Sequence, residues 1–179
     1  MGVVAIILAY IIGALPMGYL AVKYMTGKDI TGHGSGRTGG TNAMRAGGFW
    51  AGLATALLDV SKGFASVWIA RWLMPESIWW QIICGAVAVF GHNWSVWVYL
   101  LRGRFSAGAG TGPNVGVATA FWAPSALVLF PIVALFILVV GYASVASLVA
   151  ALLIPILFLL RFIFVGTPWE YVIYGLITS

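Results

Sequence analysis

The chain has 179 residues, of which 62% are hydrophobic and 7% are charged, and its formal net charge is +5. Soluble domains are nearer half apolar and a quarter charged, so this composition excludes a soluble globular fold, and its hydrophobicity excludes a disordered chain. We therefore expect an all-α, polytopic membrane protein in which residues 1–179 form a single integral membrane domain.

The first three apolar stretches are each long enough to cross a bilayer as a helix, which takes about 20 residues. They cover residues 1–25, 49–73 and 78–101, and Pro16 predicts a kink in the first of them. Residues 1–25 are not expected to be a cleaved signal peptide, because no basic segment precedes the apolar run and the run is longer than such peptides use.

Residues 113–142 permit two interpretations, because Pro124 and Pro131 interrupt an apolar stretch that is long for one helix. The first interpretation is a single tilted and kinked helix. The second, which the placement of charges favours, is a short helix to Ala123 followed by a return helix from Ser125 to Val140.

The last part of the chain contains one complete apolar span, residues 144–163, and the start of another after the Gly-Thr-Pro break at residues 166–168. Residues 169–179 would make only about 16 Å of helix, which is too short to cross the hydrocarbon core. We interpret this segment either as a re-entrant or interfacial helix or, with preference, as the beginning of a span that continues beyond Ser179.

Charge placement indicates the orientation, since the cytoplasmic loops of membrane proteins are rich in Lys and Arg. Taking two polar connections, residues 26–48 and 102–112, as cytoplasmic predicts about seven crossings with the N-terminus outside. Some of these cations could also hold an anionic substrate. Six of the nine Lys and Arg lie on or beside the two connections: Lys23, Lys28, Arg37, Arg45, Arg102 and Arg104.

Residues 31–48, the first glycine-rich segment, carry the densest functional signal. Glycine lets backbone N–H groups converge on an anion, Ser35 adds a hydroxyl, and Arg45 adds a planar guanidinium that suits phosphate. A helix that begins near Thr41 or Asn42 would aim its N-terminal amides at the same ligand. The pattern is not a Walker P-loop, and the alternative interpretation is a flexible interhelical loop whose cations neutralise lipid.

Polar residues also lie inside the expected spans, where they are costly and usually face the protein interior. Asp59 and Lys62 are three residues apart and can pair on one helical face, either to orient the helix or to present Lys62 to a substrate anion. His92 is more typical of an interhelical hydrogen bond than of a base. It precedes the second glycine-rich segment, residues 102–112, and the two segments together predict the two halves of one anion site.

The remaining polar residues exclude several kinds of chemistry. The single Cys84 and the two His predict neither a disulfide framework nor a metal centre, and no cofactor is expected. The sequence has no evident Ser–His–acid set, and chemistry based on positioning and anion stabilisation fits better. Ser144 and Ser147 lie three residues apart in a third turn and can cap the next helix or bridge to a ligand.

The run Ser35-Gly-x-x-Gly39-x-Thr41-Asn42-x-x-Arg45 resembles the first motif of the bacterial acyl-phosphate:glycerol-3-phosphate acyltransferases, the PlsY family. Later landmarks of that family are matched in the same order by Asp59-x-x-Lys62-Gly63, Gly91-His92-x-Trp94 and Tyr142-x-Ser144-x-x-Ser147. The resemblance covers nearly the whole chain, and its first motif is the most specific part.

The resemblance implies a multi-pass enzyme of the bacterial inner membrane, with its active site facing the cytoplasm. Such enzymes transfer a fatty acyl group from acyl phosphate to the 1-hydroxyl of sn-glycerol 3-phosphate, which gives lysophosphatidic acid and phosphate for phospholipid synthesis. The expected partners are these two substrates and membrane lipids, with no nucleic acid. The residues implied as catalytic are Ser35, Asn42 and Arg45, and those implied as substrate-binding are Gly36, Gly39, Gly40, Thr41, Lys62, His92, Arg102, Arg104 and Ser144.

The chain departs from the family pattern in two places. The family has a lysine in its second glycine-rich segment, where this chain offers Arg102 or Arg104 instead, and it has a His-x-x-Asn motif that this sequence lacks. A non-catalytic homologue, or a membrane carrier for a phosphorylated metabolite or lipid, is therefore the alternative function. Against a carrier, the sequence shows no internal repeat with broken helices in corresponding halves.

Overall fold

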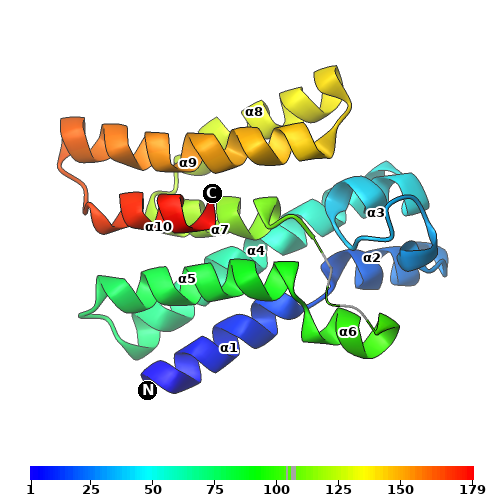
Figure 1. The fold of residues 1–179 in the computed structure, drawn as a ribbon, viewed down its shortest axis with the longest axis horizontal. Helices are drawn as coiled ribbons and strands as arrows, with labels where there is room; N and C mark the ends of the chain where they lie inside the picture. The colour runs from blue at the N-terminus through cyan, green and yellow to red at the C-terminus, as the bar shows by residue number, and fades with distance from the viewer. Residues whose placement is uncertain (104, 106–107) are drawn as a thin grey trace.

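The computed structural model describes residues 1–103, 105 and 108–179, and the described residues form helices and connections without a strand. The all-α expectation is confirmed. Figure 1 shows long helices running side by side, with α2, α3 and α6 gathered at the end of the molecule opposite the N-terminus. The helices are α1 (Gly2–Ala14), α2 (Met17–Thr26), the 3₁₀ helix η1 (Ile30–Gly32), α3 (Gly40–Gly47), α4 (Phe49–Leu73), α5 (Ile78–Asn93), α6 (Val96–Arg102), α7 (Thr111–Phe121), α8 (Ser125–Val140), α9 (Ala143–Val165) and α10 (Glu170–Thr178).

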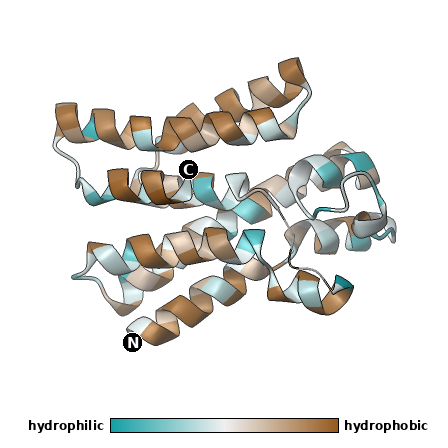
Figure 2. Ribbon diagram, viewed as in Figure 1, coloured by the Kyte–Doolittle hydropathy of each residue, from teal (hydrophilic) through white to brown (hydrophobic). Residues whose placement is uncertain are grey.

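Two helices in the described part of the chain, α4 and α9, are long and apolar enough to cross a membrane by themselves. A third candidate is the pair α1 and α2, which together pass the same test and are bent by 40° at the expected Pro16 break. Helix α8 is apolar but shorter. Figure 2 shows that α8 and α9 are almost wholly hydrophobic, whereas hydrophilic residues gather around α3. The number of crossings and the orientation stay predictions.

The expectation of one continuous span over residues 78–101 is wrong, because the structure breaks it into α5 and α6. The cause is Ser95, which caps α6: its hydroxyl accepts from the Val98 amide at 3.2 Å. The same hydroxyl donates to the Ala14 carbonyl at 2.5 Å, so the α5–α6 break packs against the end of α1. For residues 113–142 the two-helix interpretation is confirmed, since the chain breaks between Phe121 and Ser125.

Glycine lets α4 and α7 approach each other at backbone distance. A Cβ atom added to Gly63 would lie 2.0 Å from the Pro113 carbonyl oxygen, and one added to Gly116 would lie 2.0 Å from the Val60 carbonyl oxygen. Small residues permit this close packing between membrane helices, where the hydrophobic effect contributes little to association. The contact fixes the start of α7, and with it the end of the second glycine-rich segment, against the middle of α4.

Candidate active site

The first glycine-rich segment folds around the side chain of Asn42, which is 3% exposed. The Asn42 amide nitrogen donates to the carbonyl oxygens of His33 and Arg37, both at 2.9 Å, and to that of Ile30 at 3.3 Å. The Asn42 carboxamide oxygen accepts from the Ser35 amide at 3.2 Å. One buried side chain therefore holds the backbone of residues 30–37 in place, a role that the sequence did not reveal.

Helix α3 begins at Gly40, as expected for a helix that starts near Thr41. Its N-cap residue, Gly39, has no side chain to satisfy the first-turn amides, which have no partner within the helix. These amides carry the positive end of the helix dipole and form an anion-binding position. The side chains of Ser35 and Arg45 are exposed on the same short segment, and Gly36 is buried beneath it.

An ion pair joins the two polar connections, residues 26–48 and 102–112. The Arg102 guanidinium lies 2.6 Å from the Asp29 carboxylate, although the two residues are far apart in the sequence. The Thr31 hydroxyl donates to the same carboxylate at 2.5 Å. This hydrogen bond is the main reason why the pKa of Asp29 is lowered; burial acts in the opposite direction, and Arg102 lowers the pKa further. Arg102 is thus directed to Asp29 in this structure. Arg104, the other candidate for the missing lysine, lies outside the described residues.

Asp59 and Lys62 form the ion pair expected from their spacing, with 2.9 Å between Lys62 Nζ and Asp59 Oδ1. His92 joins them, since its Nδ1 lies 2.7 Å from Lys62 Nζ. Lys62 Nζ also donates to the carbonyl oxygen of Leu15, the C-cap residue of α1, at 2.9 Å. All three side chains are buried, and the cluster lies against Gly108 and Gly112 at the end of the second glycine-rich segment.

The third turn lies close to the second glycine-rich segment. The hydroxyl of Thr111, the first residue of α7, donates to the Ser147 hydroxyl at 2.7 Å, which links α7 to α9. Ser144 is exposed in the first turn of α9, whose N-terminus has no side-chain cap. The N-termini of α3, α7 and α9 all lack such a cap.

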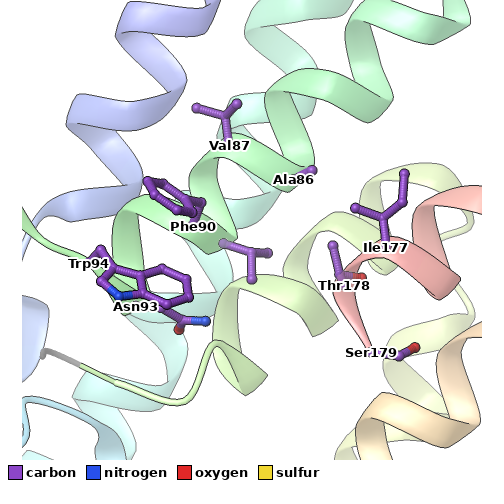
Figure 3. A pocket seen from close by; sticks show the side chains of 9 residues that line it. Ala86, Val87, Phe90, Asn93, Trp94, Ile177, Thr178 and Ser179 are labelled. Carbon is purple, nitrogen blue, oxygen red and sulfur yellow. The ribbon is translucent and has the colours of Figure 1, made fainter.

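A cavity of about 430 Å³ opens between α5 and α10 and is shown in Figure 3. Its wall is mainly apolar, but Asn93 lies at the end nearest the second glycine-rich segment: a Cβ atom added to Gly110 would be 3.0 Å from the Asn93 carboxamide oxygen. That oxygen is buried and has no hydrogen-bond partner among the described residues. The cavity is lined by Ala86, Val87, Val89, Phe90, Asn93, Trp94, Ile177, Thr178 and Ser179.

The family model for glycerol-3-phosphate acyltransferases matches residues 3–179 of this chain. The chain belongs to this family. A glycerol-3-phosphate acyltransferase of Thermosynechococcus vestitus is 32% identical over 188 residues, an alignment that covers 100% of this chain and 84% of the relative. One from Desulforudis audaxviator is 35% identical over 169 residues, covering 94% of this chain and 80% of the relative.

Crystal structures of PlsY, an integral membrane glycerol 3-phosphate acyltransferase, are similar to this fold over its whole length. The glycerol 3-phosphate form has a TM-score of 0.81 and 29% sequence identity, and the match covers 99% of this chain and 84% of that one. The lysophosphatidic acid form has a TM-score of 0.77 and 28% identity.

Proposed function

We propose that this protein transfers a fatty acyl group from acyl phosphate to the 1-hydroxyl of sn-glycerol 3-phosphate, releasing lysophosphatidic acid and inorganic phosphate. The observation that carries the proposal is the uncapped start of α3, set beside the loop that Asn42 holds, in a chain of the glycerol-3-phosphate acyltransferase family. The solved relatives support it, because one is a glycerol 3-phosphate form and the other a lysophosphatidic acid form.

In this proposal the two substrates share the first glycine-rich segment. Ser35 and Arg45, whose side chains are exposed there, hold the phosphate of glycerol 3-phosphate. The α3 first turn, Gly39 to Thr41, holds the acyl phosphate with its backbone amides. Gly36 gives the backbone room at the same place, and Ser144 and Arg102 close the site from the other side.

The proposed chemistry is acyl transfer without a protein base. The 1-hydroxyl oxygen of glycerol 3-phosphate attacks the acyl carbon, and the α3 amides stabilise the tetrahedral oxyanion. The bond between the acyl carbon and the phosphate oxygen then breaks, and the leaving phosphate takes the proton of the hydroxyl. Support comes from Asp29, whose carboxylate is already occupied by Thr31 and Arg102. Catalysis then rests on positioning and on electrostatic stabilisation.

The mainly apolar cavity between α5 and α10 suits the acyl chain, because its polar end at Asn93 lies beside the second glycine-rich segment. We further propose that the protein is in the bacterial inner membrane and that the glycine-rich segments face the cytoplasm, in keeping with the six cations on or beside the two polar connections that contain them. Glycerol 3-phosphate, a charged metabolite, would then reach the site from water and the donor from the bilayer.

Phosphate release by the purified protein tests the proposal. In detergent or liposomes, wild-type protein given palmitoyl phosphate and glycerol 3-phosphate should release phosphate at a rate that depends on both substrates. The matched control is Arg71→Ala, a change at a cation that bonds Gln81 and Ala120 far from the site. A folded wild-type preparation that binds glycerol 3-phosphate and releases no phosphate would instead favour a carrier or a non-catalytic homologue.

A further inference from the structure

The cluster of Asp59, Lys62 and His92 has no part in the reaction proposed above, yet it is almost wholly buried. We propose that His92 is a positioning residue for residues 108–112, and that Lys62 holds its imidazole in the tautomer with the proton on Nε2. The functional part of this inference rests on the proposed acyltransferase activity, whereas the tautomer does not.

The tautomer follows from counting donors. A lysine ammonium has three N–H donors and no acceptor. Lys62 Nζ has two hydrogen-bond partners among the described residues, the Leu15 carbonyl at 2.9 Å and His92 Nδ1 at 2.7 Å. The Asp59 carboxylate is its ion-pair partner at 2.9 Å, and Asp59 Oδ1 lies 3.6 Å from His92 Nδ1, beyond hydrogen-bond distance. Since an ammonium can only donate, the His92 Nδ1 that lies 2.7 Å from it must offer its lone pair. The imidazole is therefore neutral and carries its single proton on Nε2.

The protonated Nε2 points at the second glycine-rich segment. A Cβ atom added to Gly108 would lie 1.9 Å from His92 Nε2, so the backbone of Gly108 rests directly on the imidazole edge. Beyond Gly108, a Cβ atom added to Gly112 would lie 2.7 Å from Asp59 Cβ. Gly108 and the first turn of α7 thus lie against two members of the cluster, and only residues without a side chain permit that approach.

The cluster also connects this segment to the Pro16 break between α1 and α2. Lys62 binds the Leu15 carbonyl next to Pro16, and Ser95 binds the neighbouring Ala14 carbonyl. Three chain breaks, after α1, between α5 and α6 and before α7, are thereby held at one level of the molecule. Because α2 and α3 follow the Pro16 break, the cluster sets the position of residues 108–112 relative to the first glycine-rich segment.

Nuclear magnetic resonance tests the tautomer independently of activity. The chain has two His, so ¹⁵N-labelled His33→Gln protein in detergent leaves His92 as the one signal in a long-range ¹H–¹⁵N spectrum. At pH 7.5 we expect the pattern of a neutral imidazole protonated on Nε2. A neutral ring protonated on Nδ1, or a doubly protonated ring, would overturn the inference.

Two substitutions of His92 separate positioning from simple packing. Glutamine places an amide N–H near the position of Nε2, whereas asparagine places one near Nδ1. We expect His92→Asn to speed hydrogen exchange in residues 108–112 and to lower kcat/KM about tenfold, with His92→Gln within about threefold of wild type. Equal effects of the two variants on exchange would overturn the positioning role. If wild type proves inactive, the proposed function fails but the exchange and resonance results still decide this inference.

Discussion

Replacing Asn42 with alanine should release the first glycine-rich segment while leaving the helical body folded. The change removes two donors and one acceptor from a side chain that is 3% exposed. It breaks the three shorter hydrogen bonds, with the carbonyls of His33 and Arg37 and the amide of Ser35, and also the longer one with the Ile30 carbonyl at 3.3 Å. All three shorter bonds act on residues 33–37, so the effect should be local.

The size of the effect follows from those three bonds. Each contributes about 0.5–1.5 kcal/mol net, for a sum of about 1.5–4.5 kcal/mol. His33 and Arg37 are exposed, so water replaces part of what is lost, and we expect about 2 kcal/mol, a factor of about 30 in the opening of the loop. Asn42→Asp should be at least as severe, because a carboxylate would face the three carbonyl oxygens to which the amide nitrogen now donates.

Hydrogen exchange followed by mass spectrometry measures this opening directly. We expect faster exchange in residues 33–37 of Asn42→Ala, unchanged exchange in α9, and a raised KM for glycerol 3-phosphate. Met44→Leu, a change at a half-exposed position of the same helix, is the control and should match wild type. If exchange in residues 33–37 stays at the wild-type rate, Asn42 does not organise the loop and its proposed role is wrong.

Three further predictions concern charge and packing. Arg45→Ala should raise the KM for glycerol 3-phosphate by about 10- to 100-fold, because one charged hydrogen bond is lost, and should raise the KM for acyl phosphate less. A larger rise in the KM for acyl phosphate would contradict the assignment of Arg45 to glycerol 3-phosphate. The pKa of Asp29 is lowered in the folded protein, so its stabilising effect should be present at pH 7 and fade as the pH falls through that pKa. The Tm difference between wild type and Asp29→Asn should accordingly narrow below about pH 4, and a difference that grows there would refute the sign. Gly63→Ala should push α4 away from α7, which should lower the Tm and reduce the free energy of unfolding by about 1–3 kcal/mol or more. Gly32→Ala is the control and should leave the Tm unchanged, because a Cβ atom there would meet nothing within 4 Å.

Several helices could be predicted from the sequence because short, local patterns determine where they begin and end. The bounds of α4 follow from the length of its apolar run, and the start of α8 follows from Pro124, which precedes it. The Asp59–Lys62 pair follows from helical periodicity. The break between α5 and α6 had a local signal too, since Ser95 is a favoured N-cap residue, but the surrounding apolar run obscured it.

Contacts between distant segments could not be predicted in the same way. The pairing of Asp29 with Arg102, and the meeting of His92 with Lys62 and the Leu15 carbonyl, depend on how helices far apart in the sequence pack together. Asn42 was expected to touch substrate because it stands in a specific motif. Its three carbonyl partners became visible only once the loop was folded, since polar side chains give no sequence signal of the backbone groups they will satisfy.

Product analysis tests the central proposal most directly. Purified wild-type protein would be given ¹³C-labelled glycerol 3-phosphate with either palmitoyl phosphate or palmitoyl-CoA, and the lipid product would be measured by mass spectrometry alongside released phosphate. We expect 1-palmitoyl lysophosphatidic acid from palmitoyl phosphate, in equal amount to the phosphate released, and none from palmitoyl-CoA. No labelled lysophosphatidic acid from a folded preparation, or equal product from both donors, would contradict the proposed reaction.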